Sequence, residues 1–431
     1  MKKVTYFGLL LAVALTGLSS CSSSDDVTSD PTNTKSGESR LTLTISTPVA
    51  KTSSAKGNSF AMGSRATDFT DATAPTVANE QQINHITVAI FSSDGSTVRT
   101  IQELTKHTGT GSAAAGDGTY SQHDDKASAT IVTNSLTAAD KIYVVCNAPA
   151  GTFQGVQNAT DFEDKTEGID NALAMEFGET KEKASLVSLV DHNIPMYGQG
   201  TLKAVDNSDN FTADVTVQHQ TAKVTLSELT VDFDQNGPYK DASFEPTGIF
   251  LMNVPSTLKF TSAATTGSTT LLQGYDPQTT ATYKQYLSTS AISTSKVLSG
   301  NSDATSTNTF GKSYFFYTMP NSLTAKDKRT KLVIMGKFKS NKANSGEGST
   351  VYYPVPLNAN YDTDGIAHAA DKKDDKTDIP FVVNPNKNYK CTVKIKTKGA
   401  SSPTTDVTPQ QVAITVTVSG FTDASQTTIF N

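Results

Sequence analysis

Hydrophobic and polar residues alternate with a period of two along many short segments of this chain. The clearest segment reads LTLTISTPV, and its apolar face is formed by Leu41, Leu43, Ile45 and Val49. Because successive side chains of a strand point to opposite faces, this pattern predicts a half-buried β-strand over residues 41–49. Proline cannot donate a backbone hydrogen bond, so Pro48 indicates a sheet edge or a strand terminus.

Strand-like patterns continue through most of the remaining chain. The segment INHITVAIFSSDG, from Ile83, is apolar on both faces, which predicts a strand buried on both sides. Further short strands are predicted at residues 97–104, 129–133, 141–147, 211–217, 222–233, 248–254, 313–320, 331–338, 352–357, 389–396 and 412–418. The small and polar residues 50–71 predict a linker. Many short strands with few short helices predict an all-β protein built of β-sandwiches.

The length of 431 residues suggests two sandwich domains in tandem, each with a core that needs no disulfide staples. We expect the boundary in the polar stretch 200–210, which gives domains at residues 66–205 and 206–431. Pro and Gly are sparse and the formal net charge is −6, so a low-complexity chain is disfavoured. The basic footprint of a nucleic-acid binder is missing, and no nucleic-acid partner is predicted.

The N-terminus has the layout of an export signal. Lys2 and Lys3 precede an apolar run from Val4 to Leu18, which is too short for a comfortable membrane span. The run ends in Leu-Ser-Ser-Cys, which resembles a bacterial lipobox. By that resemblance residues 1–20 are a signal peptide and Cys21 carries the lipid that anchors the chain to the outer membrane. An ordinary secretory signal with an incidental cysteine is the alternative.

Candidate catalytic chemistry is sparse. None of the six histidines is spaced as a metal-ligand pair, and no GxSxG, Walker or GxGxxG pattern appears. We therefore predict no enzyme, no metal and no cofactor, although carboxylates cannot be paired from sequence and a glycosidase stays open. Cys146 and Cys391 lie in apolar strand patterns and are expected to be buried thiols. A disulfide between them is the alternative.

The four arginines are informative because they are so few. Arg99 lies in a predicted strand and Arg329 lies just before another, whereas Arg40 and Arg65 flank the segment 41–49. Cleavage after Arg65 would release the anchor and the first strand together, and cleavage after Arg40 would release the anchor alone. A sheet that loses a strand exposes unpaired backbone groups, which a strand from a neighbouring molecule can satisfy. A head-to-tail contact of this kind builds a filament.

Several motifs together resemble the fimbrillin family, the subunits of protease-assembled type V pili. They are the lipobox at Cys21, the Arg65-Ala66 junction, INHITVAIFSSDG, IYVVCN (142–147), IPMYG (194–198), the AKV strand (222–224), YTMPN (317–321), YKCTVKI (389–395) and the VAITVTVSGFTD ending. The resemblance spans most of the chain and rests on the order and spacing of these pieces.

The resemblance implies two transthyretin-like β-sandwich domains and a lipidated propeptide, residues 21–65. It implies that an Arg-specific surface protease cuts between Arg65 and Ala66 and removes a plugging strand, 41–49. The donor that replaces this strand would be the C-terminal tail 421–431, with 412–418 as a candidate extension. The apolar residues of that tail are Phe421, Ile429 and Phe430. Because the rest of the tail is polar, a tip or accessory subunit that accepts a strand without donating one stays open.

We therefore predict a structural subunit of cell-surface fimbriae that supports adhesion and carries no catalytic residue. The expected partners are other fimbrial subunits, the protease, the outer membrane through the lipid before processing, and a host or bacterial adhesion ligand. The alternative is a surface lipoprotein that binds glycan or host protein and never polymerises. A surface hydrolase has the least support.

Overall fold

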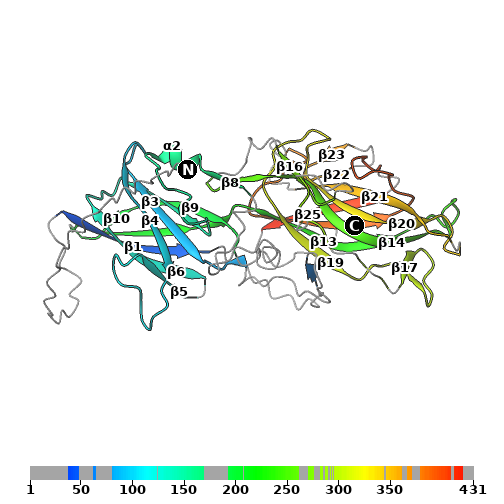
Figure 1. Cartoon of the computed structure of the whole chain (residues 1–431), viewed down its shortest axis with the longest axis horizontal. Helices are drawn as coiled ribbons and strands as arrows, with labels where there is room; N and C mark the ends of the chain where they lie inside the picture. The colour runs from blue at the N-terminus through cyan, green and yellow to red at the C-terminus, as the bar shows by residue number, and fades with distance from the viewer. Residues whose placement is uncertain are drawn as a thin grey trace, which may run out of the picture.

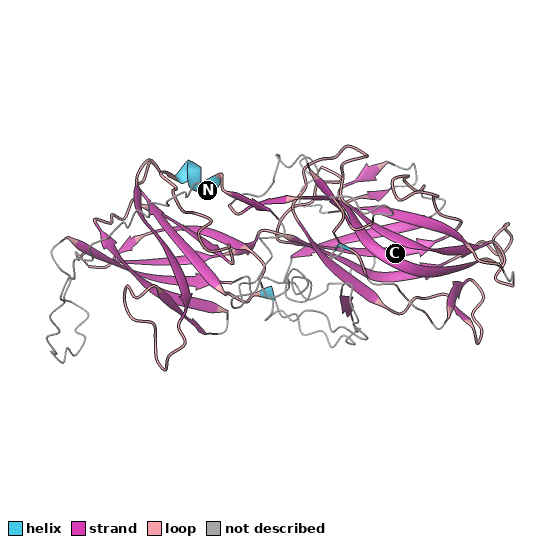
Figure 2. Cartoon of the chain, in the orientation of Figure 1, coloured by secondary structure: helices cyan, strands magenta, loops and turns pink. Residues whose placement is uncertain are grey.

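The computed structural model is almost entirely β-structure, arranged as two lobes along the long axis of the molecule (Figure 1 and Figure 2). It describes residues 37–47, 62–64, 80–123, 125–168, 193–206, 208–261, 270–275, 282–284, 287–289, 292, 294, 296–343, 346–361, 366–370, 379–408 and 412–420. The described residues include one short helix, α2 (Ala159–Glu163). The predicted all-β class is confirmed.

The first lobe is a sandwich whose two layers belong to one continuous sheet of ten strands. In sheet order these are β10 (Lys203–Ala204), β11 (Asn210–Thr216), β1 (Glu38–Ser46), β6 (Lys126–Asn134), β5 (Thr119–His123), β4 (Val98–Lys106), β3 (His85–Phe91), β7 (Lys141–Cys146), β9 (Met196–Thr201) and β12 (Gln218–His219). The layers meet where β4 pairs with β5 over two residue pairs. Between the layers, Leu43 and Ile131 share one buried core with Val88 and Val144.

Strand β3 is buried on both faces, as its sequence pattern predicts. Ile86 and Ile90 point into the core between the layers. Phe91 points to the opposite face, where its ring contacts Phe162 of α2 at a centroid distance of 5.7 Å. A strand with apolar residues on both faces can occupy only the middle of a covered sheet, which is where β3 lies.

The second lobe is a sandwich of two separate sheets. One has the order β2 (Met62–Ser64), β19 (Ser313–Thr318), β13 (Ala222–Val231), β24 (Lys387–Ile395) and β25 (Val412–Gly420). The other has the order β18 (Ser306–Thr307), β17 (Val297–Ser299), β14 (Ser243–Pro255), β20 (Lys331–Lys339) and β21 (Ser349–Pro356), with β16 (Leu271–Gln273) also on β14. Two short pairs complete the fold: β8 (Thr166–Gly168) with β15 (Thr257–Lys259), and β22 (Asn360–Tyr361) with β23 (Ala367–His368).

The boundary between the sandwiches lies later in the chain than we predicted. Strand β11 pairs with β1, and β12 pairs with β9, so residues 210–219 belong to the first sandwich. The predicted boundary after residue 205 is therefore wrong, and the first strand of the second sandwich that follows β12 in the chain begins at Ala222. The described residues 205–206 and 208–209, most of them polar, lie between β10 and β11, which are antiparallel neighbours. A hairpin turn and a linker share the same composition.

A buried polar cluster joins the two sandwiches around Glu80. Its carboxylate oxygen Oε1 accepts hydrogen bonds from Lys223 Nζ at 2.6 Å and from the Tyr317 hydroxyl at 2.7 Å. Its backbone oxygen lies 2.7 Å from Nε2 of His219. Because a carbonyl oxygen can only accept, Nε2 carries the proton. Burial lowers the pKa of His219 from 6.5 to about 4, so the ring is neutral near pH 7.

This buried histidine predicts a pH-dependent stability. Between pH 6.5 and about 4 the unfolded chain binds a proton on His219 that the folded chain does not, so the free energy of unfolding should fall as the pH is lowered through this window. The expected loss from this group is roughly 3 kcal/mol. Urea unfolding of a His219→Gln variant, which keeps an N–H donor but does not titrate, should show a flatter decline. Parallel pH curves for the two proteins would contradict the assignment.

Candidate functional site

Strand β1 is held in a slot between two strands that are distant in sequence. It pairs antiparallel with β6 and parallel with β11. Leu43 lies opposite Ala129 on one side and opposite Ala213 on the other. All three apolar side chains of β1 that the structure describes are fully buried: Leu41, Leu43 and Ile45. The alternation read from the sequence thus corresponds to a buried strand in the interior of the first sheet.

Backbone and side-chain hydrogen bonds fix both ends of β1 in this slot. At the start, the Ser39 hydroxyl accepts a hydrogen bond from the Leu136 N–H at 3.1 Å. At the end, Thr47 N–H and its hydroxyl both donate to the Asp125 carbonyl, at 2.9 and 3.1 Å. These contacts help to fix the register of β1. The apolar face fixes it too, because a slip by one residue would turn that face to the solvent.

Without β1, the slot would be an apolar groove with two unpaired edges. The facing backbone groups of β6 and β11 would lose their partners, and the core side chains that contact β1 would meet water. Burial of each Leu or Ile side chain stabilises by about 1.5–3 kcal/mol, so three of them give the slot a strong preference for being filled. Gly198 of β9 packs closely against the far end of β11, where a Cβ atom would lie 2.4 Å from the Thr216 carbonyl oxygen. This contact supports β11 independently of β1.

A second short strand precedes Arg65 and contacts the other sandwich. Strand β2, Met62–Ser64, pairs in parallel with Ser313–Phe315 of β19 at the sheet edge. The sequence pattern indicated only a linker here, because three residues carry too little periodicity to predict a strand. The segment that ends at Ser64 therefore contacts both sandwiches, through β1 in the first and β2 in the second.

Three of the four arginines lie in described, folded surroundings. Arg40 is inside β1, where its N–H donates to the Asp209 carbonyl at 3.0 Å. Arg99 lies in β4, with its Nε 3.3 Å from Asp140. Arg329 is buried, contacts Asp406 and stacks over the ring of Phe381.

Strand β25 of the second sandwich repeats the residue pattern of β1. It lies at the edge of its sheet, next to β24. Val412 and Val416 are each 2% exposed, and the partly buried Ile414 between them packs against the same core. The residues between these three positions are the smaller Ala413 and Thr415, so large apolar side chains recur at every second position.

The remaining sequence-predicted site residues lie outside the described residues: Cys21, Val49, Arg65, Ala66, Phe421, Ile429 and Phe430. The two strands that flank β1 were not assigned to it from the sequence, because pairing partners distant in the chain leave no local pattern. Small residues lie opposite Leu43 on both sides, Ala129 in β6 and Ala213 in β11, but small residues alone do not identify a pairing partner.

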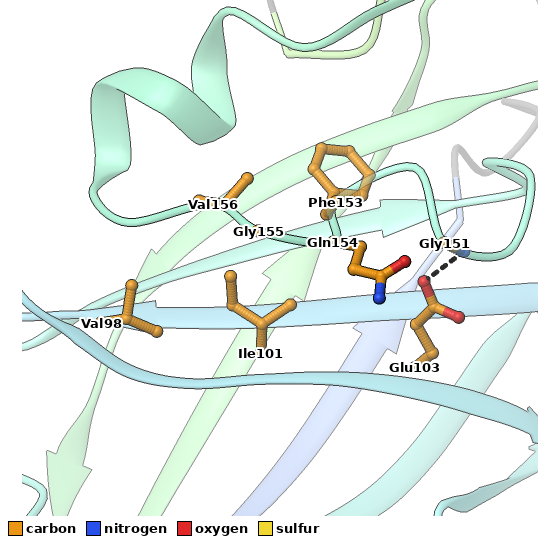
Figure 3. Close-up of a pocket in the computed structure, with 8 residues that line it drawn as sticks. All are labelled: Val98, Ile101, Glu103, Gly151, Phe153, Gln154, Gly155 and Val156. Atoms are coloured by element: carbon orange, nitrogen blue, oxygen red, sulfur yellow. Dashed lines mark hydrogen bonds between the residues drawn. The ribbon is translucent and has the colours of Figure 1, made fainter. Parts of the chain in front are cut away.

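A groove of about 470 Å³ lies on the outer face of the first sandwich (Figure 3). Val98 and Ile101 of β4 line one side, and Val156 lies across from them. Glu103 lies at one end, where its Oε1 accepts a hydrogen bond from the Gly151 N–H at 2.8 Å. It is the one carboxylate among the residues that line this groove, so the lining offers no acid–base pair of carboxylates for hydrolysis.

Neither a metal-binding cluster nor a disulfide occurs in the described part of the chain. No group of three or more His, Cys, Asp or Glu side chains among the described residues could hold a metal ion. Cys146 and Cys391 are buried free thiols, and burial raises the pKa of both. Within the described ranges, no helix is long and apolar enough to cross a membrane.

The tandem sandwiches share their fold with solved fimbrial and adhesion-type proteins. A fimbrilin (FimA) from Porphyromonas gingivalis matches with a TM-score of 0.52 and 17% identity, over 90% of this chain and 99% of that chain. A protein from Bacteroides eggerthii, proposed to act in cell adhesion, matches with a TM-score of 0.52 and 20% identity, over 89% of this chain and 96% of that chain. A similarly described protein from Parabacteroides distasonis gives a TM-score of 0.53 and 14% identity, over 89% and 99%.

Residues 58–228 match the family model of the major fimbrial subunit protein, FimA. The matched range begins shortly before Arg65 and contains every described strand of the first sandwich except β1. The resemblance to fimbrillins that the sequence motifs indicate is thereby confirmed. A comparison with curated protein sequences finds no match. The family match thus covers the first sandwich apart from β1, and the solved structures show that the fold is shared over most of the chain.

Proposed function

We propose that the chain is the precursor of a fimbrial subunit, anchored by a lipid on Cys21 and polymerised by strand exchange after cleavage between Arg65 and Ala66. The observation that carries this proposal is the position of β1. A strand from outside the matched family range fills the middle of the first sandwich and buries three alternate apolar side chains there. No catalytic residue is needed, because backbone pairing and apolar burial supply the binding energy.

Cleavage after Arg65 would detach β1 and β2 from the rest of the chain in one step, since both strands precede this residue. Their loss would open the slot between β6 and β11 and free the edge of β19. Arg65 is the favoured processing site because the other three arginines are held in strands or ion pairs, which hinders proteolysis at those positions. Arg40 in particular has its backbone bound within β1.

The donor strand is the C-terminal end of the chain, and we favour β25 as its apolar part. Val412, Ile414 and Val416 reproduce the every-second-residue spacing of Leu41, Leu43 and Ile45. The tail 421–431, with Phe421, Ile429 and Phe430, would extend the same strand. A donor that replaces β1 would run parallel to β11 and antiparallel to β6. Each contact joins the donor strand of one subunit to the slot of the next. Such head-to-tail contacts do not close into a ring, so a filament grows.

The test is the N-terminal residue and mass of the protein sheared from the cell surface. A start at Ala66, on a ladder of oligomers that resists SDS, is the expected result. A lipidated Cys21 start on all of the protein would overturn the proposal and favour a non-polymerising lipoprotein. A start at Ala66 without a ladder would indicate a tip or accessory subunit, which accepts a strand but does not donate one.

A further inference from the structure

The free edge of β25 is bound by a side chain from a different sheet. Asn360 of β22 donates a hydrogen bond from Nδ2 to the Val416 carbonyl at 2.9 Å, and its Oδ1 accepts one from the Val416 N–H at 2.7 Å. A carboxamide that donates and accepts in this way occupies the place of a residue in a neighbouring strand. It satisfies the backbone N–H and C=O groups of Val416, which could otherwise pair with a strand of another chain.

The position of Asn360 also shows which backbone groups of β25 face outward. In an antiparallel pair, the N–H and C=O groups of successive residues point alternately toward and away from the partner strand. Because those of Val416 point to Asn360, those of Ile414 face the same free edge. Ile414 borders a cavity of about 160 Å³ that is also lined by Tyr361 and Val407. The free edge of β25 is thus hydrogen-bonded at Val416, whereas a cavity lies beside it at Ile414.

The connection that precedes β25 is fastened at a second point. The carboxylate of Asp406 contacts Arg329 and lies 2.7 Å from Nζ of Lys331, the first residue of β20. Lys331 is 2% exposed, so this ion pair is screened little by solvent. Asp406 lies six residues before β25 and does not belong to it. It can therefore hold the base of β25 while the strand itself moves.

We propose that Asn360 is a latch that holds β25 in its own subunit and sets the rate at which the strand becomes available for exchange, with Asp406 as the fixed pivot. The inference rests on the proposed function and on β25 as the donor. Opening requires the two Asn360 hydrogen bonds, the ladder to β24 and the apolar contacts of β25 to be given up. The ladder and the apolar contacts are made again in the slot of the next subunit, and the Asn360 contact is not.

The first test compares Asn360→Ala with a matched variant, Asn341→Ala, which removes a side-chain hydrogen bond to the backbone of Ala343 far from β25. In the uncut precursor, amide hydrogen exchange in residues 412–420 should become about tenfold faster in Asn360→Ala and stay unchanged in Asn341→Ala. After proteolytic processing in vitro, the assembly rate of Asn360→Ala should rise by a similar factor. Unchanged exchange in Asn360→Ala would overturn the latch whatever the assembly rate does.

A second variant tests the donor assignment separately. Val416 lies directly opposite Cys391, and both side chains are buried on the same face. At a position of this kind the Cα atoms are about 4.5 Å apart, within the range of a disulfide. Oxidised Val416→Cys should assemble not at all, and reduction should restore assembly. Assembly of the oxidised protein would eliminate β25 as donor and the latch with it, whereas failure of processed wild-type protein to assemble would refute the proposed function itself.

Discussion

Substituting lysine for Arg65 should stop the chain from forming fimbriae on cells that process it with an Arg-specific protease. Without cleavage, β1 and β2 stay covalently attached, and the slot between β6 and β11 remains filled. We expect the full-length, lipid-anchored precursor to accumulate in the outer membrane and the SDS-resistant ladder to disappear. Because only the junction changes, the thermal unfolding of the precursor should match that of the wild type.

Purified precursors separate the effect of the cut from any effect on folding. An Arg-specific protease should convert purified wild-type precursor into an assembling subunit and leave position 65 of Arg65→Lys uncut, while the two precursors unfold at the same temperature. Arg40→Lys is the matched control and should mature normally, because Arg40 is bound within β1. Ladder formation by uncut Arg65→Lys protein would show that assembly does not require loss of the plugging strand.

The positions and buried faces of single strands could be predicted, because the alternation of apolar and polar residues along a strand is a local property of the sequence. Leu41, Leu43 and Ile45 show their common face within five residues, and the observed β1, Glu38–Ser46, overlaps the predicted strand. The two-sided burial of β3 was predictable for the same reason. Pro48 suggested an edge or a terminus. The terminus is the correct alternative, since β1 ends at Ser46 and has neighbours on both sides.

The long-range part could not be predicted from a single sequence. The parallel pairing of β1 with β11 joins residues about 170 positions apart, and nothing in the pattern of either strand names its partner. The predicted domain boundary was wrong for the same reason. Only the pairing of β11 with β1 assigns β11 to the first sandwich. Asn360 shows the limit for polar contacts: an asparagine in a charged loop is unremarkable until the fold brings it beside Val416.

Leu43→Ala should weaken the precursor strongly and speed its conversion. Leu43 is fully buried between β6 and β11, so the substitution removes apolar contacts and leaves a cavity, at a cost of about 2–5 kcal/mol. The first sandwich should melt about 5–15 °C lower in a thermal scan. The same loss weakens the hold of the slot on the cut segment. After proteolysis, the peptide that contains β1 should leave faster, and assembly should begin after a shorter lag.

Thr42→Ala is the matched control in the same strand. Thr42 is exposed, so its truncation should change stability by no more than about 0.5 kcal/mol and leave the lag unchanged. Mass spectrometry of the cut protein, separated by gel filtration over time, reports peptide release directly. If Leu43→Ala lowers the melting temperature but neither release nor the lag changes, then β1 is a structural strand of the first sandwich and not a plug. If the melting temperature falls, peptide release becomes faster and the lag becomes shorter in the same variant, then the burial of Leu43 controls the rate of assembly.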